Sequence, residues 1–164
     1  MRPHVFLLFT GISVVVAHPL LAAAPAAFEA YPVPFLFSGR PAQVQLSTPC
    51  ARTYRTRLRA DAREGPNFAG HLTVISCGCG AGCVRLDLVD AETGRVSQPP
   101  FDTLITWPCG DRDSPDPNLE PVEYRRDSRL LVLKGMTGPD KACYAHDFVW
   151  ERNQLHEIDK QPFP

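Results

Sequence analysis

The sequence predicts an α+β, mostly β fold: an antiparallel meander of hairpins with one N-terminal helix packed on it, stabilised by disulfides. All six cysteines lie downstream of an apolar leader, and an even number of cysteines in a short exported chain is typical of a disulfide framework. The 17 prolines disfavour long helices. Short segments with alternating apolar residues recur between turn sequences, as expected of hairpin strands.

Residues 1–26 have the pattern of a secretory signal peptide. Arg2 and His4 precede an apolar run over residues 5–17, and small residues suited to cleavage follow it. The run is shorter than the roughly 20 apolar residues that a membrane-spanning helix needs. We therefore expect a single secreted, disulfide-rich domain over residues 27–164, a periplasmic or secreted location, and no integral membrane segment after cleavage.

The next two segments predict an N-terminal arm and a helix. Residues 28–46 are rich in proline and aromatic residues, which favours an extended arm that packs its aromatic side chains on the core. Thr48 is suited to cap a helix, Pro49 suits the first helical position, and Gly65-Pro66 ends the helix.

Within this helix, Cys50, Tyr54 and Leu58 recur at four-residue spacing and predict a narrow buried stripe. Arginines fill much of the remaining surface. An arginine-rich face suits an acidic partner, although such a face is more often simply solvated. These arginines are Arg52, Arg55, Arg57, Arg59 and Arg63.

The rest of the chain is predicted to form strands. Val84, Leu86 and Leu88 alternate with polar residues, which is the signal of a half-buried strand. In 130–133 the apolar run is uninterrupted, so we expect both faces of that strand to be covered. The expected strands are 71–76, 84–88, 95–97 and 101–107, followed by hairpins 122–125 with 130–133 and 144–150 with 155–158.

Four short motifs occur in a distinctive order: GPNFAGH at 65–71, CGAGC at 79–83, VDAETGRV at 89–96 and DSRLL at 127–131. In these motifs the chain resembles a group of small exported bacterial proteins that are uncharacterised. The resemblance covers roughly residues 50–150 and implies an exported, hairpin-rich protein, without implying an activity. The similar proteins have an aromatic residue where this chain has Cys77, so Cys77 is expected in an additional bridge.

The cysteines are expected to form disulfides rather than a metal site or a redox centre. Three cysteines within residues 77–83, with His71 nearby, have donor atoms for a soft metal ion. However, the chain lacks the C-x-x-C spacing of zinc sites and of thioredoxin-type redox pairs. We expect no metal and no other cofactor. The expected bridges are Cys79–Cys83, Cys109–Cys143 and Cys50–Cys77.

No complete catalytic signature is present in the sequence. His71, His146 and His156 are candidate bases for a cysteine nucleophile. Ser128 beside Asp127 has residue types of a hydrolase triad, but no Gly-x-Ser-x-Gly motif surrounds it, and the pair is better interpreted as a turn. His71 opens a strand, so we expect a structural role for it, with a site role as the alternative.

A long loop rich in proline and aspartate extends from Cys109 to Pro121. Its aspartates have roughly the spacing of a calcium loop, but the turn glycine and the closing glutamate are absent. The loop is too long for a simple connection. Stiffening by proline and anchoring at Cys109 would reduce the entropy lost on binding. The residues expected to bind a partner are Asp111, Arg112, Asp113, Pro115, Asp116 and Pro117.

These features predict a non-catalytic module that binds another exported protein, for example an inhibitor or immunity protein against a cell-envelope hydrolase. The balance of 17 Lys and Arg against 18 Asp and Glu lacks the basic excess of nucleic-acid-binding proteins. The alternative is a small periplasmic enzyme or metal-binding protein that uses His71, Cys77 and His146. A concave pocket with convergent polar groups would favour that alternative.

Overall fold

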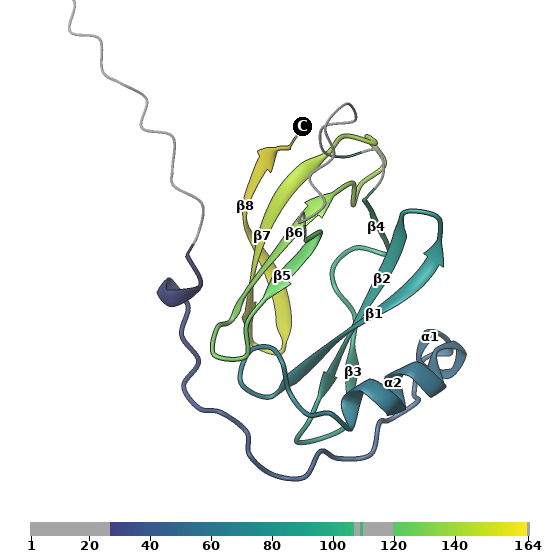
Figure 1. Ribbon diagram of the computed structural model, residues 1–164, viewed down its shortest axis with the longest axis vertical. Helices are drawn as coiled ribbons and strands as arrows, with labels where there is room; N and C mark the ends of the chain where they lie inside the picture. The colour runs from purple at the N-terminus through teal and green to yellow at the C-terminus, as the bar shows by residue number, and fades with distance from the viewer. Residues whose placement is uncertain (1–26, 107–108, 110–119, 164) are drawn as a thin grey trace, which may run out of the picture.

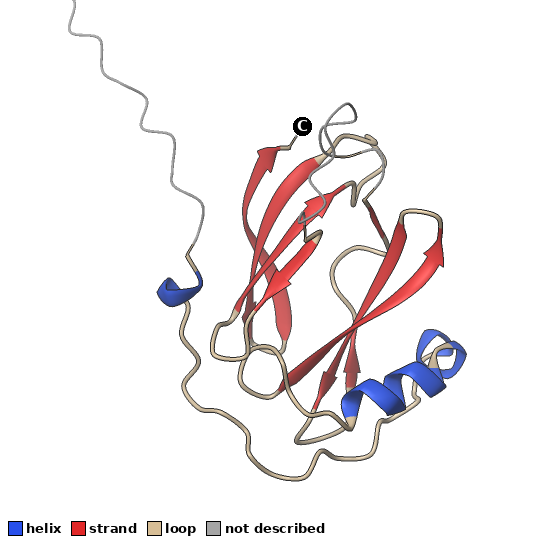
Figure 2. Ribbon diagram, in the orientation of Figure 1, coloured by secondary structure: helices blue, strands red, loops and turns tan. Residues whose placement is uncertain are grey.

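The computed structural model describes residues 27–106, 109 and 120–163. Two antiparallel sheets pack against each other, and two short helices cover the outer face of the first sheet (Figures 1 and 2). The predicted α+β, mostly β class with antiparallel hairpins and disulfides is confirmed. None of the helices among the described residues is long and apolar enough to cross a membrane.

The N-terminal arm begins with the short 3-10 helix η1 (Phe28–Ala30) and passes around one end of both sheets to residue 48 (Figure 1). Backbone hydrogen bonds hold it: Val33 N–H donates to the Asp127 carbonyl and Phe37 N–H to the Gly70 carbonyl. The expectation that its aromatic side chains are packed into the core is only partly met, because Phe35 is 48% exposed. The arm is fastened mainly through its backbone.

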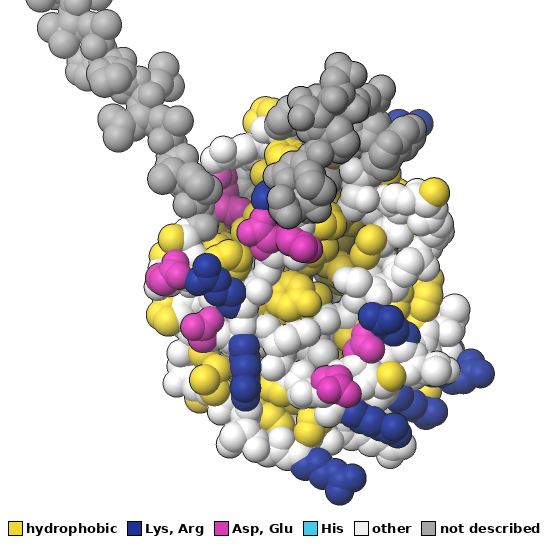
Figure 3. Space-filling view, viewed as in Figure 1, with side chains coloured by type: hydrophobic (Ala, Val, Ile, Leu, Met, Phe, Trp, Pro, Cys, Tyr) yellow, Lys and Arg dark blue, Asp and Glu magenta, His cyan; other side chains and the backbone are white. Residues whose placement is uncertain are grey.

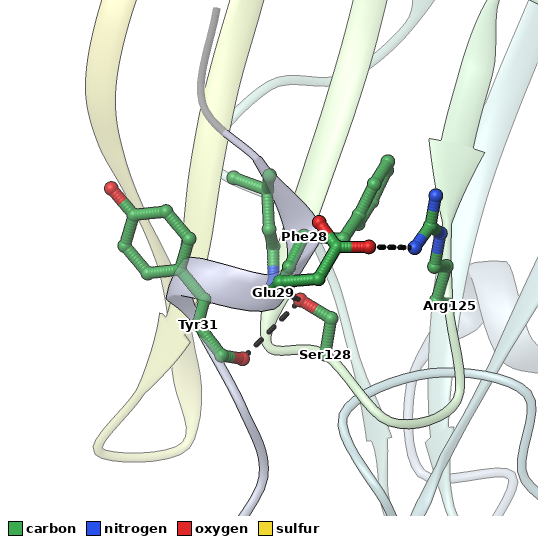
Figure 4. A network of polar contacts seen from close by, with 6 residues as sticks. Phe28, Glu29, Tyr31, Arg125 and Ser128 are labelled. Carbon is green, nitrogen blue, oxygen red and sulfur yellow. Dashed lines mark hydrogen bonds and ion pairs between the residues drawn. The ribbon is translucent and has the colours of Figure 1, made fainter.

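Ser128 ties the arm to the second sheet, as Figure 4 shows. Its hydroxyl lies 2.8 Å from the Phe28 carbonyl and 3.2 Å from that of Tyr31. Beside it, Arg125 pairs with Glu29 and lies over the Phe28 ring. Ser128 is thus a structural turn residue, in keeping with the sequence interpretation.

The predicted helix is present but interrupted. Thr48 caps α1 (Pro49–Thr53) through its hydroxyl, which accepts from Ala51 N–H at 3.0 Å. Tyr54, with φ −95° and ψ 18°, separates α1 from α2 (Arg55–Ala62). One residue outside helical geometry ends the first helix, so the single predicted helix becomes two. Of the predicted stripe, only Leu58 is fully buried.

The first sheet is built on a long hairpin. β1 (Leu72–Gly80) pairs along its length with β2 (Cys83–Asp90). Two short strands, β3 (Val96–Ser97) and β4 (Leu104–Ile105), pair with opposite ends of β2.

The second sheet is the predicted meander. Its four antiparallel strands follow the order β5-β6-β7-β8. The β7–β8 turn at Arg152 and Asn153 has φ of 50° and 63°, the left-handed geometry of a tight two-residue hairpin turn. The strands are β5 (Val122–Tyr124), β6 (Leu130–Gly135), β7 (Tyr144–Glu151) and β8 (Gln154–Pro162).

Two apolar clusters hold the layers together. The larger fills the space between the sheets and includes Phe68, Leu131 and Phe148. The smaller lies between the first sheet and the helices and includes Leu58 and Ile75. Leu131 and Leu133 on one face of β6 and Leu130 on the other are fully buried, whereas Val132, on the same face as Leu130, is only partly buried. The prediction that both faces of β6 are covered therefore holds in part.

The GPNFAGH segment joins the arm, the first sheet and the β5–β6 turn. Gly70 has φ +79°, and a Cβ there would lie 2.2 Å from the Phe35 carbonyl oxygen. Its N–H donates to the Arg126 carbonyl, and Ala69 N–H donates to that of Ser128. The 65–71 and 127–131 motifs therefore meet in space and have a structural role.

Candidate functional site

Two of the three predicted disulfides are confirmed. Cys79–Cys83 closes the tip of the β1–β2 hairpin, with Cα atoms 5.2 Å apart. Cys109–Cys143 joins residues 34 positions apart, with Cα atoms separated by 5.6 Å. Disulfides of this kind are typical of proteins from oxidising compartments.

The ends of the predicted docking loop are both fastened to the second sheet. Cys109 is bonded to Cys143, immediately before β7. At the other end, the Pro121 carbonyl accepts from Lys134 N–H at 2.9 Å, and Val122 begins β5. The predicted binding residues themselves, Asp111, Arg112, Asp113, Pro115, Asp116 and Pro117, lie outside the described residues.

The third predicted bridge, Cys50–Cys77, is absent, and both cysteines are free. Cys50, in α1, lies beside the Arg85 guanidinium instead of bonding to Cys77. Cys77 is buried in the cluster under the helices, and this burial, reinforced by Asp87, raises its pKa to about 11. It remains a thiol at neutral pH, which makes it a poor nucleophile and a poor metal ligand.

Asp87, on β2, is a buried carboxyl group for which the sequence pattern contains no signal. It is fully buried, and neither carboxylate oxygen has a hydrogen-bond partner among the described residues. Burial raises its pKa, although the Arg85 charge and the Gln98 side chain act in the opposite direction. Asp87 lies close enough to Cys77 to raise that residue's pKa as well.

Asp87→Asn is expected to stabilise the protein at neutral pH by about 1–3 kcal/mol, because it removes a charge that burial disfavours. A carboxyl whose pKa is raised in the folded state binds its proton more tightly there than in the unfolded chain. Stability therefore falls as the pH rises from the ordinary carboxyl pKa through the raised one, and the variant should lose this dependence. Urea denaturation from pH 4 to 8 measures it. A destabilised variant at pH 7 would show that attraction to Arg85 outweighs burial.

His146 lies on β7, between two polar partners for which the sequence contains no signal. Its Nδ1 donates to Glu157 Oε1 on β8 at 2.6 Å, and its Nε2 lies 3.2 Å from Thr137 Oγ1. Because the carboxylate fixes the proton on Nδ1, Nε2 is free to accept from the Thr137 hydroxyl. The three residues line a depression of about 350 Å³. This order of hydroxyl, imidazole and carboxylate is that of a nucleophile, a base and an orienting acid.

His71 lies at the start of β1, on a surface formed with the arm and the β7–β8 turn. Its Nδ1 donates to the Ala69 carbonyl at 2.9 Å, and its ring stacks on Phe35 with centroids 5.8 Å apart. Two depressions of about 350 and 320 Å³ share Phe35, His71, Trp150 and Asn153.

The three residues of the alternative site are placed in different parts of the fold. His71 lines the depressions beside Trp150, His146 lines the depression with Thr137, and Cys77 is buried beneath the helices. A single site made of all three is therefore not formed. Within the described residues, no group of three or more His, Cys, Asp or Glu side chains is arranged to hold a metal ion.

Comparison of the chain with protein-family models, with curated proteins and with solved structures gave no match.

Proposed function

We propose that this protein is a non-catalytic binding module for another exported protein, acting as an inhibitor or immunity protein against a cell-envelope hydrolase. The supporting observation is the anchoring of the 109–121 loop at both ends. Cys109 is covalently bound to Cys143, and the Pro121 carbonyl is hydrogen-bonded to Lys134. A segment with fixed ends has fewer conformations to lose on binding than a free one of equal length.

Two sequence features support the same proposal. The leader over residues 1–26 would deliver the protein to the compartment where envelope hydrolases act. Within the loop, Pro115 and Pro117 restrict the backbone of the chain between the anchored ends. An anchored, proline-containing loop suits insertion into the cleft of an enzyme.

The test is inhibition of purified peptidoglycan hydrolases by the mature protein, using a muramidase, an amidase and an endopeptidase. Pro115→Gly/Pro117→Gly is expected to weaken inhibition by about 1–2 kcal/mol, or roughly 5- to 30-fold, because it enlarges the set of unbound conformations. Pro32→Gly/Pro34→Gly is the matched control, since it makes the same change at the same spacing in the arm. The control should inhibit as the parent does.

Two outcomes would contradict the proposal. One is that no hydrolase of the panel is inhibited by the parent. The other is that the two double variants weaken inhibition equally, which would show that the loop prolines have no specific part in binding. Thermal denaturation of each variant establishes that the fold is retained.

A second candidate function, a small hydrolytic enzyme, is favoured by one observation, the hydrogen-bonded order Thr137–His146–Glu157. Incubation of the protein and its variants with peptidoglycan, without any added hydrolase, distinguishes this enzymatic function from binding. Release of soluble fragments by the parent, abolished in His146→Gln and Thr137→Ala but retained in the loop variant, would establish the enzyme. A binding module releases none.

A further inference from the structure

A cavity lies between the N-terminal arm and α2. It has a volume of about 760 Å³. Residues 40–44 of the arm line one side, and Arg59, Ala62 and Arg63 of α2 line the other. The volume falls within the roughly 300–1,000 Å³ typical of small-molecule sites.

The arm side of this cavity is held in place by the 91–94 turn. Ala42 N–H donates to the Ala91 carbonyl at 2.8 Å, and Gln45 N–H donates to the Gly94 carbonyl at 2.7 Å. Gly94 has φ +74°, and a Cβ there would lie 2.0 Å from the Gln43 carbonyl oxygen, so the turn and the arm are in close contact.

The helix side is equally fixed. Ala62 is 4% exposed and packs in the apolar cluster beneath α2, together with Val44 from the arm. Both walls of the cavity are therefore attached to the first sheet. Groups on fixed walls bind a ligand without a large loss of backbone freedom.

The cavity is strongly positive. Arg40, Arg59 and Arg63 line it, and no acidic residue does so among the described residues. Within the same part of the chain, none of these three guanidinium groups makes a hydrogen bond or an ion pair. Other arginines do have carboxylate partners: Arg57 with Asp61, Arg85 with Asp102, Arg125 with Glu29 and Arg129 with Glu151.

Nearby carboxylates do not neutralise this charge. Asp61 is engaged by Arg57 at 2.6 Å, and Glu64 does not line the cavity. Figure 3 shows dark blue Lys and Arg side chains gathered over α1 and α2. Three cationic groups around one cavity repel each other, and an anion between them removes that repulsion.

We propose that this cavity binds a phosphate-bearing anion of the size of a short phosphate chain or a phosphorylated sugar. The planar guanidinium fork donates two parallel hydrogen bonds to a phosphate, and a phosphate group has enough oxygens and charge to engage more than one arginine at once. The ligand is either a soluble anion or a lipid headgroup with the same chemistry. None of the residues that line the site belongs to the 109–121 segment, so the variants below test it independently of the proposed function.

Calorimetric titration of the mature protein with inorganic triphosphate at low ionic strength tests the proposal. Arg40→Gln and Arg59→Gln should each weaken binding roughly 10- to 100-fold, as expected for loss of a charged hydrogen bond. Arg55→Gln is the matched control, because Arg55 is an exposed α2 arginine that does not line the cavity. It should cause only the small loss due to a screened, remote charge. Thermal midpoints should match the parent throughout.

Two further experiments define the chemistry and the source of the ligand. Tricarballylate, a tricarboxylate, should bind more weakly than triphosphate. Cosedimentation with phosphatidylglycerol vesicles identifies a headgroup source if the parent and Arg55→Gln bind while Arg59→Gln does not. A soluble ligand is indicated if triphosphate binding is retained in Arg55→Gln and weakened in Arg59→Gln while the vesicles do not bind.

Three results would overturn the proposal. The first is that the parent binds neither triphosphate nor vesicles. The second is that Arg55→Gln weakens binding as much as Arg59→Gln, which would show that only net charge matters. The third is that tricarballylate binds as tightly as triphosphate or more tightly, which would contradict the assignment of a phosphate ligand.

Discussion

Leu131→Ala is expected to lower the free energy of unfolding by about 2–5 kcal/mol, because it leaves a cavity in the centre of the protein. Leu131 is fully buried in the cluster between the two sheets. On β6 it pairs with Tyr124 of β5 and Phe148 of β7, so strands on both sides limit any collapse around the deleted atoms. Urea denaturation under non-reducing conditions measures the loss.

Leu36→Ala is the matched control for this change. Leu36 is 51% exposed in the arm, so the same truncation there should change stability by no more than about 0.5 kcal/mol. Equal losses in the two variants, or an unchanged midpoint for Leu131→Ala, would place β6 outside the core.

Local patterns in the sequence were sufficient to predict the two hairpins of the second sheet. The uninterrupted apolar run 130–133 indicated a strand covered on both faces, and the Thr48-Pro49 start of the helical region was correct because a cap depends on neighbouring residues. The break at Tyr54 has no local signal, because the spacing of apolar residues continues across it. The pairing of β3 and β4 with one strand, β2, depends on the path of long connections and has no local signal.

The surroundings of His146 illustrate why the site could not be predicted. A two-residue turn at 152–153 fixes the pairing Glu151–Gln154 and, in regular steps, Phe148–Glu157. The next pair is Asp147–Asp159, so a bulge leaves Ile158 without a partner, and this residue is 45% exposed. Glu157, two residues after buried Leu155, faces the same side as Phe148 and reaches His146. The sequence gives no signal for the bulge.

The phosphate cavity has the same origin in tertiary structure. In the sequence, Arg59 and Arg63 belong to an arginine-rich helix face, and such a face is more often solvated than part of a binding site. Arg40 comes from the arm, and it meets them only because the 91–94 turn holds residues 42–45 against the first sheet. The concentration of charge is therefore a product of the fold.

Removing the Cys109–Cys143 bridge by substituting both cysteines with alanine is expected to destabilise the protein by about 4 kcal/mol in the chain-entropy model, because the bridge closes 34 positions of sequence. Removing Cys79–Cys83 in the same way should cost about half as much, or roughly 2 kcal/mol, because that bridge spans only 4 positions. Urea denaturation of both double variants measures the difference, and equal losses would contradict the loop-length argument.

The same pair of variants separates the loop's contribution to binding from its contribution to stability. Cys109–Cys143 fixes one end of the 109–121 loop, whereas Cys79–Cys83 closes only the β1–β2 hairpin. If the loop docks into a hydrolase, loss of the first bridge should weaken inhibition roughly 10-fold or more even at a temperature where the variant is fully folded, because binding must then order a freed end. Loss of the second should leave inhibition at the parent level. A folded Cys109→Ala/Cys143→Ala variant that inhibits as well as the parent would show that anchoring at Cys109 has no part in recognition.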